Sequence, residues 1–211
     1  MSSTQRILLF TRYPQPGKVK TRLIPHVGPT AAAVLHTKLT ELTLRTVQPL
    51  YQQAEAELHI CCCGGSEPDV RAWLGEGTWL FHEQQGESLG ARMLQAFTEA
   101  WQSGAGRVIV IGSDCPDLTT ALLRRAFTLL TEHDLVLGPA TDGGYYLLGL
   151  RAESKAQSSL FVGIDWGTDR VLQQTLSKAV RAGLSYALLP DLHDIDRPED
   201  LAHLDHYPCL Q

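Results

Sequence analysis

Apolar residues in this chain alternate between short runs of strand type and longer stretches with helical spacing. Val108–Ile111 is entirely apolar and β-branched, as in a strand that is buried on both faces. In the stretch that follows, Leu122, Leu123, Ala126 and Leu130 recur at helical spacing. Repeated alternation of this kind is typical of βαβ units, in which helices connect parallel strands. The sequence therefore predicts an α/β fold with a mostly parallel sheet and helices on both faces.

The expected elements follow one another along the whole chain. Strands are expected at residues 7–10, 58–63, 79–81, 108–111, 135–137, 145–150 and 184–189. Helices are expected after Thr30, around 70–74, from Ser88 and from Thr119, and over 168–182 and 198–204. The sequence shows no internal repeat, linker or low-complexity tract, and 211 residues suit one α/β domain. We therefore expect a single domain over residues 1–211.

The composition argues against several classes of protein. An excess of 23 acidic over 18 basic residues gives a net charge of −5, which disfavours a broad nucleic-acid-binding face. The longest apolar run, Ala31–Leu35, is far below the roughly 20 residues that cross a bilayer, so no membrane span is expected. The N-terminus lacks a signal-peptide pattern, and the adjacent Cys61–Cys63 suit a buried strand better than disulfides or zinc. We expect a cytoplasmic protein without nucleic-acid partners.

The loop after the first expected strand is strongly basic. Four cations fall within eleven residues, namely Arg12, Lys18, Lys20 and Arg22. Gly17 lets the backbone approach a ligand, and Lys and Arg side chains neutralise phosphate oxygens. A solvated basic loop is the alternative. Because the loop follows a strand end, where α/β proteins bind ligands, we favour a phosphate site.

Acidic residues gather in two other loops. Asp114 directly follows the most buried expected strand, where a carboxylate can hold a hard divalent cation. Asp117 has a simpler interpretation, because it precedes a helix N-terminus. Near the C-terminus, Asp194 and Asp196 share one face of an extended segment, so both can reach one metal ion. These loops predict a metal site at the carboxyl edge of the sheet.

The segment Thr141–Tyr146 lies between two expected strands and contains Asp142, Gly143 and Gly144. Asp-Gly-Gly is by itself only a turn signal, and it bears on function only if the loop faces the same cleft. Tyr145 suits a core position and a substrate platform equally well. We therefore treat Asp142, Gly143, Gly144 and Tyr145 as candidate substrate residues.

Together these loops resemble the nucleotide-diphospho-sugar transferase superfamily, whose GT-A fold is a Rossmann-like α/β architecture. More closely, the chain resembles small bacterial glycosyltransferase-like proteins akin to 2-phospho-lactate guanylyltransferase. The resemblance covers nearly the whole chain and rests on PQPGKVKTRL at 14–23, GESLGARM at 86–93, GSDCPDL at 112–118, TDGGYYLLGL at 141–150, WGTDRVLQQT at 166–175 and DIDRPEDL at 194–201. One departure is Arg197, where the family often has a threonine that caps the last helix.

The resemblance implies roles for particular residues. Lys20 and Arg22 would bind a di- or triphosphate, supported by Arg12, Gly17 and Lys18. Asp114 would hold Mg²⁺ or Mn²⁺, and Asp194 and Asp196 would complete the metal site. Lys20, Arg22 and Asp114 are thus the candidate catalytic residues. Arg92 would contact the nucleotide, unless it is simply a cation on a helix surface.

Three functions remain open at this point. The first is nucleotidyl transfer from a nucleoside triphosphate to a small acceptor, which the dense basic loop favours because a triphosphate needs many cationic partners. The second is glycosyl transfer from a nucleotide-sugar, which the same carboxylates would serve. The third is nucleotide binding without catalysis. Both transfers depend on neutralising the charge of a leaving group. The acceptor and the oligomeric state stay undetermined.

Overall fold

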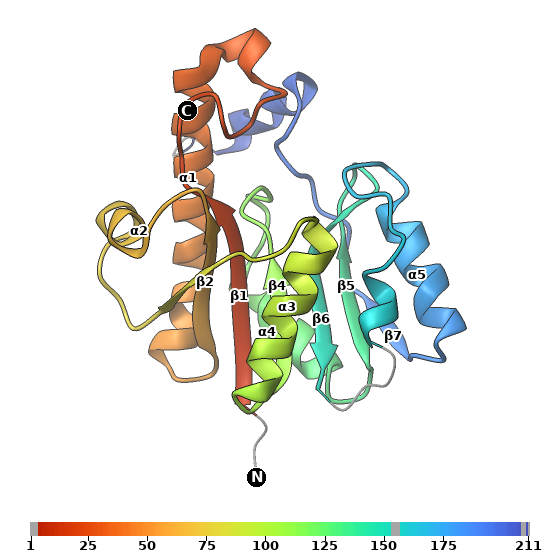
Figure 1. Cartoon of the computed structure of the whole chain (residues 1–211). Coiled ribbons are helices and arrows are strands. Elements are labelled where there is room, and N and C mark those ends of the chain that lie inside the picture. Colours follow the sequence, from red (N-terminus) through yellow and green to blue (C-terminus); the bar gives the residue numbers. More distant parts are fainter. Residues whose placement is uncertain (1–3, 153–156, 208–209, 211) are drawn as a thin grey trace.

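The computed structural model describes residues 4–152, 157–207 and 210 and is built on one seven-stranded sheet (Figure 1). The strand order is β3-β2-β1-β4-β6-β5-β7. The strands are β1 (Thr4–Arg12), β2 (Glu57–Cys63), β3 (Leu80–Glu83), β4 (Ala105–Ile111), β5 (Leu135–Pro139), β6 (Tyr145–Arg151) and β7 (Tyr186–Leu188). Only β6 runs antiparallel to its neighbours among these strands, so the predicted mostly parallel α/β sheet is confirmed.

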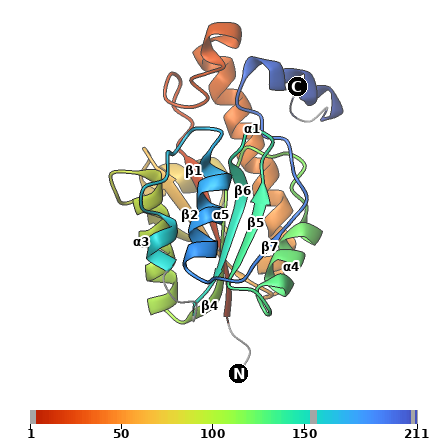
Figure 2. The same ribbon diagram turned by 90° about the vertical axis from the view of Figure 1, so that its right-hand side faces the viewer.

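Helices cover both faces of this sheet, as predicted (Figure 2). The helices are α1 (Ile24–Gln52), α2 (Glu67–Leu74), α3 (Leu89–Gln102), α4 (Thr120–Leu129) and α5 (Val171–Arg181), with 3₁₀ helices η1 (Gln157–Leu160) and η2 (Pro198–His206). Alternate residues of β1 face opposite layers, because Ile7 and Leu9 pack with α1, α2 and α4, whereas Leu8 packs with α3 and α5. Within the described residues, no helix combines the length and the apolar character that crossing a membrane requires.

The boundaries of several helices differ from the predicted ones. The first helix begins at Ile24 rather than after Thr30, and it is kinked at Gly28, whose φ of 81° and ψ of 162° are not helical. The helix expected from residue 168 begins at Val171, and the last helix is a 3₁₀ helix. By contrast, Ser88 and Thr119 cap α3 and α4 as predicted, accepting hydrogen bonds at 3.2 and 3.3 Å.

The C-terminal segment returns to the carboxyl edge of the sheet. The backbone N–H of Ile195 donates to the carbonyl of Asp114 at 2.9 Å, just beyond β4. The side chain of Ile195 packs with Leu23, Leu35 and Leu39 around the N-terminal half of α1. In Figure 1 this blue segment lies beside the upper part of α1. The fold thus brings residues near 20, 114 and 195 to one place.

Candidate active site

A pocket of about 620 Å³ opens at the carboxyl ends of β1 and β4, and we call it the main pocket. It is lined by Phe10, Thr11, Arg12, Lys18, Val19, Lys20, Thr21, Arg22, His36, Gln84, Glu87, Leu89, Arg92, Gly112, Ser113, Asp114 and Asp196. Ligands of open α/β sheets bind at this edge. The pocket therefore gathers nearly all the predicted phosphate-binding residues and two of the three predicted metal ligands.

Lys20 is the most enclosed charge of the main pocket, with a side chain that is 3% exposed. Its Nζ lies 2.6 Å from Asp114 Oδ1 and 3.8 Å from Asp196 Oδ1, and it donates to the carbonyl of Ile195 at 2.5 Å. The residue has a φ of 46°, a left-handed conformation that is unfavourable for residues other than glycine. Such strain persists where the surrounding contacts fix the conformation, and it is typical of functional sites.

Arg22 extends this arrangement toward the surface. Its Nη1 lies 2.5 Å from Asp196 Oδ2, and its Nη2 donates to the carbonyl of Gly167 at 3.5 Å. Asp196 therefore contacts both predicted phosphate ligands. The predicted proximity of Asp114 and Asp196 agrees with this geometry, because both carboxylates reach the ammonium of Lys20.

Asp114 stays negatively charged although its burial disfavours the charge. Burial acts to raise the pKa of Asp114, but the neighbouring charge and hydrogen bond of Lys20, with His36 and Arg12, hold it below its usual value. A carboxylate with this pKa stays ionised at neutral pH. Asp114 can thus serve as an anionic ligand.

A second pocket of about 280 Å³ adjoins the first, and we call it the acidic pocket. It is lined by Thr141, Asp142, His193, Asp194, Asp196, Arg197, Glu199 and Asp200, so Asp196 belongs to both pockets. Burial raises the pKa of Asp194 to about 6, and the charges of Asp142, Asp200 and Asp114 act in the same direction. Negative charge thus accumulates here without an equal number of cations.

This donor set fits a hard divalent cation by its chemistry. Asp114, Asp194 and Asp196 offer carboxylate oxygens, the ligands that Mg²⁺ and Mn²⁺ prefer. The pKa of Asp194 is raised chiefly by burial and also by the neighbouring carboxylates, whose negative charge a cation would neutralise. Within the described residues, however, no three Asp, Glu, His or Cys side chains already form a group that could hold a metal ion. The position within reach of both Asp114 and Asp196 holds the Lys20 ammonium.

Of the four candidate substrate residues, Asp142 lines one of these two pockets, and the other three line neither. Asp142 lines the acidic pocket, and its Oδ1 accepts a hydrogen bond from the Gly144 N–H at 2.7 Å, which closes a turn. Gly143 has a φ of 87°, and a Cβ there would lie 2.2 Å from the carbonyl oxygen of Asp169, so close packing requires glycine. Tyr145 packs edge-on against Trp166 with ring centroids 6.4 Å apart, and burial raises the pKa of its hydroxyl. Packing therefore accounts for Gly143 and Tyr145.

The remaining cations take different positions. Arg92 lines the main pocket from α3, and its Nε donates to the carbonyl of Gly86 at 2.9 Å. Arg12 and Lys18 line the same pocket, and Gly17 turns the loop with a φ of 83°. Arg197 lines the acidic pocket. The N-terminus of η2 is capped by Asp200, which accepts from the backbone N–H groups of Asp196 and Arg197 at 3.0 and 2.6 Å.

Asp117 lines neither the main nor the acidic pocket. Its side chain accepts a hydrogen bond from the Tyr207 hydroxyl, and its Oδ2 lies 3.2 Å from His203 Nε2. These contacts connect the loop after β4 with η2. The residue therefore fixes the C-terminal segment in addition to preceding α4.

A buried polar network in the wall of the main pocket was not predicted from the sequence. His36 Nε2 lies 2.9 Å from the carbonyl of Arg12 and 3.3 Å from Thr11 Oγ1. Thr11 Oγ1 also lies 3.2 Å from Thr40 Oγ1 and 3.5 Å from Ser113 Oγ. Burial lowers the pKa of His36, although Asp114 opposes the change. The only sequence signal is a histidine among apolar residues at helical spacing, which is more often a core residue.

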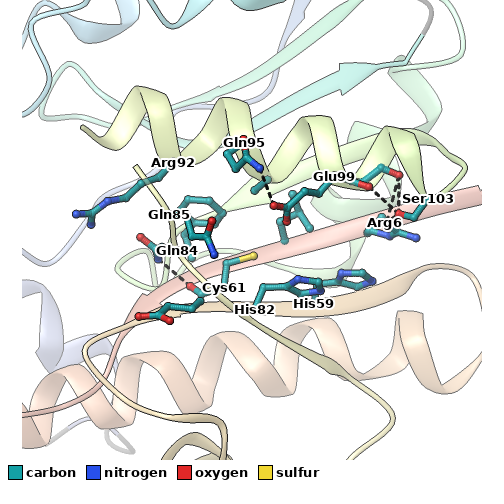
Figure 3. A pocket seen from close by; sticks show the side chains of 15 residues that line it. Arg6, His59, Cys61, His82, Gln84, Gln85, Arg92, Gln95, Glu99 and Ser103 are labelled. Carbon is teal, nitrogen blue, oxygen red and sulfur yellow. Dashed lines mark hydrogen bonds between the residues drawn. The ribbon is translucent and has the colours of Figure 1, made fainter. Parts of the chain in front are cut away.

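A third, smaller cavity of about 40 Å³ lies between the sheet and α3 (Figure 3). The side chains of Arg6, His59, Cys61 and His82 project into it from the strands, and Glu99 and Gln95 reach it from α3. The cavity shares Phe10, Gln84 and Arg92 with the main pocket. Its volume suffices for a few water molecules.

The strand order, the helices on both faces and the pockets at the carboxyl edge define a fold of the nucleotide-diphospho-sugar transferase type. The chain belongs to the bacterial family described as "Uncharacterized protein conserved in bacteria (DUF2064)", which matches residues 46–168. It is similar to the solved structure of a candidate nucleotide-diphospho-sugar transferase from Desulfovibrio desulfuricans G20, with 39% identity and a TM-score of 0.87. That match covers 98% of this chain and 89% of the other, and it confirms the predicted resemblance.

More distant structures share the fold alone. The 4-diphosphocytidyl-2C-methyl-D-erythritol synthase of Anaerococcus prevotii DSM 20548 is 12% identical with a TM-score of 0.59, over 96% of this chain and 98% of that chain. Rv0371c from Mycobacterium tuberculosis H37Rv is 19% identical with a TM-score of 0.54, over 97% of this chain and 98% of that chain. No curated protein matches the sequence.

Proposed function

We propose that this protein is a divalent-metal-dependent nucleotidyltransferase, which transfers a nucleotidyl group from a nucleoside triphosphate to a small acceptor and releases pyrophosphate. The observation that carries the proposal is the main pocket itself. Basic side chains of the loop after β1 and the carboxylates Asp114 and Asp196 line one pocket at the carboxyl edge of the sheet. Phosphoryl transfer needs this combination, because negative charge develops on the leaving group. The protein accelerates such a reaction mainly by positioning the substrates and by stabilising that charge.

The residues take complementary roles in this proposal. Lys20 and Arg22 bind the phosphates of the leaving group, and Arg12 and Lys18 add positive charge along the same wall. Asp114, Asp194 and Asp196 hold Mg²⁺ or Mn²⁺, which supplies further charge neutralisation on the phosphate oxygens when it is bound. Arg92 lies on α3 at the same pocket, where its guanidinium can contact the nucleotide.

Two similar structures support the choice of ligands. Rv0371c has been solved as a complex with manganese. The Anaerococcus protein is a synthase of a diphosphocytidyl product. Both share only the fold with this chain, and the proposal therefore depends on the residues of the main pocket.

The acidic pocket provides the place for the acceptor. It adjoins the main pocket through Asp196, and its other walls come from the turn at Asp142 and from the C-terminal segment with His193 and Asp194. An acceptor bound there would lie next to the phosphates in the main pocket.

Glycosyl transfer from a nucleotide-sugar is the second candidate. It is favoured by the relative from Desulfovibrio desulfuricans, which is described as a candidate nucleotide-diphospho-sugar transferase and is 39% identical. The same lysines and arginines would then bind a diphosphate, and the same carboxylates would hold its metal ion.

The released product separates these candidates. The purified full chain is incubated with Mg²⁺ and a panel of nucleoside triphosphates or nucleotide-sugars, together with a mixture of small hydroxylated and phosphorylated acceptors. Pyrophosphate release supports nucleotidyl transfer, whereas nucleoside diphosphate release supports glycosyl transfer. Nucleotide-dependent thermal stabilisation without either product would identify a non-catalytic nucleotide-binding protein.

A further inference from the structure

Four charged side chains of the main pocket are already paired with one another. Lys20 Nζ lies 2.6 Å from Asp114 Oδ1, and Arg22 Nη1 lies 2.5 Å from Asp196 Oδ2. Lys20 is also 3.8 Å from Asp196 Oδ1. The residues proposed to bind phosphate are therefore the counter-ions of residues proposed to bind metal.

Lys20 is held in this pairing by more than charge. Its side chain is buried, and its Nζ donates a hydrogen bond to the Ile195 carbonyl at 2.5 Å. Its backbone has a φ of 46°, a left-handed conformation that is unfavourable for a residue with a side chain. A flexible lysine in solvent would meet none of these conditions. The ammonium is thus a fixed internal cation at the carboxylates.

Each free ligand meets an obstacle at such a site. A divalent cation alone must approach Asp114 and Asp196 beside the positive charge of Lys20. A polyphosphate alone must draw Lys20 and Arg22 away from their carboxylates, and it is repelled by Asp114, Asp196 and the acidic pocket. A metal–polyphosphate complex carries both charges. When the complex binds, the carboxylates contact the metal in place of Lys20 and Arg22. The side chains of Lys20 and Arg22 then contact the phosphates, so no buried charge is left unpaired.

We propose that Lys20 is the positioning residue that opposes binding of a divalent cation alone to Asp114 and Asp196, so that the cation enters the main pocket only together with its polyphosphate. This inference rests on the proposed metal and phosphate ligands. By reciprocity, the metal and the polyphosphate must raise each other's affinity by the same factor.

The test uses probes that do not depend on the nucleotide base. The metal-stripped full chain is titrated with Mn²⁺, and the electron paramagnetic resonance signal of free Mn²⁺ measures how much metal binds. Calorimetry measures the binding of inorganic tripolyphosphate and of preformed Mn²⁺–tripolyphosphate in separate titrations. For the wild-type chain we expect the complex to bind at least about ten-fold more tightly than either component. Equal affinity for Mn²⁺ alone and for the complex would overturn the proposal.

The Lys20→Met variant gives the decisive comparison. Because it removes the internal cation, we expect Mn²⁺ alone to bind at least about five-fold more tightly than to the wild type, and the complex to bind more weakly. Lys178→Met is the matched control, because Lys178 lies on α5 and lines neither pocket. A purely structural role of Lys20 predicts unchanged or weaker Mn²⁺ binding, and that result in a folded variant would refute the proposal.

Circular dichroism establishes whether Lys20→Met folds. If it does not, Arg22→Met decides the matter, since the Arg22 side chain is about half exposed and its loss leaves the core intact. We expect the same rise in affinity for Mn²⁺ alone, to a smaller extent, and no rise would count against the proposal.

Turnover assays keep this inference separate from the proposed function. Joint binding of Mn²⁺ and tripolyphosphate without any product from nucleotides would contradict the enzymatic proposal alone. Product formation combined with independent binding of metal and polyphosphate would contradict this inference alone.

Discussion

The paired imidazoles of His59 and His82 make folding stability depend on pH. Their rings stack in the cavity under α3 with centroids 4.7 Å apart and planes 3° from parallel (Figure 3). Burial, with Arg6 and His82 nearby, lowers the pKa of His59 to about 3, and burial also lowers the pKa of His82. An unfolded histidine takes up a proton near pH 6.5, so the unfolded chain binds more protons below that pH. The contribution of these buried neutral histidines to stability is therefore complete above about pH 6.5 and is lost as the pH decreases toward about 3.

Denaturant unfolding at about pH 7.5 and about pH 5 measures this loss. We expect His59→Gln to reduce the difference in unfolding free energy between the two pH values, because one buried base is gone. His26→Gln removes an exposed histidine and should leave that difference unchanged. The same pH dependence in the wild type and in His59→Gln would contradict this explanation.

A second prediction at the residue scale concerns Asp114. Asn has nearly the same volume as Asp but lacks the negative charge that a hard cation requires, so we expect Asp114→Asn to lose at least about 100-fold in kcat. The measurement is product release at saturating Mg²⁺, accompanied by thermal unfolding to show that the fold persists. Full activity with unchanged Mg²⁺ dependence would exclude Asp114 as a metal ligand.

At the scale of elements, Ser88 links helix stability to the main pocket. Its Oγ accepts a hydrogen bond from the Ala91 N–H at 3.2 Å and caps α3, the helix that carries Arg92. We expect Ser88→Ala to reduce the free energy of unfolding by about 1 kcal/mol, because the cap loses its acceptor. Denaturant unfolding is the measurement. Ser177→Ala, within α5, is the control, since alanine suits a helix interior.

The elements were predictable where local chemistry determines them. Ser88 and Thr119 are cap residues before apolar stretches with helical spacing, and both caps are present. Cys61 and Cys62 were predicted to lie in a buried strand, and they belong to opposite core layers. The start of α1 was missed because Gly28 kinks that helix without ending it. Local propensity also does not separate the 3₁₀ helix η2 from an α-helix.

The contacts within the candidate site were harder to predict from the sequence than the helices and strands. The strand-end rule placed Asp114 and the basic loop at one edge of the sheet, and both line the main pocket. This rule could not predict the partners of Lys20, because Ile195 and Asp196 lie about 175 positions further along the chain. They contact Lys20 only because the C-terminal segment returns to this edge of the sheet. His36 was missed for a similar reason, since its polar partners Thr11 and Arg12 belong to β1 and not to its own helix.

At the scale of the whole molecule, the position of the C-terminal segment depends on a few contacts. The Tyr207 hydroxyl donates to Asp117, and His203 Nε2 lies 3.2 Å from the same carboxylate. We expect Tyr207→Phe to loosen η2 from the loop after β4, because a partly buried hydrogen bond to a charged group contributes about 1.5–3 kcal/mol. Hydrogen exchange over residues 192–207 should accelerate, while exchange in β4 should stay slow. Tyr186→Phe, on the edge strand β7, is the control.

The position of Asp196 in the walls of both the main and the acidic pocket also has a kinetic consequence. Under the proposed function, the two pockets hold donor and acceptor side by side, so transfer proceeds directly within a ternary complex. Double-reciprocal plots of initial rate against donor concentration, at several acceptor concentrations, should then give intersecting lines. Parallel lines would reveal a covalent intermediate, and the donor would have to leave its group on the protein before the acceptor binds.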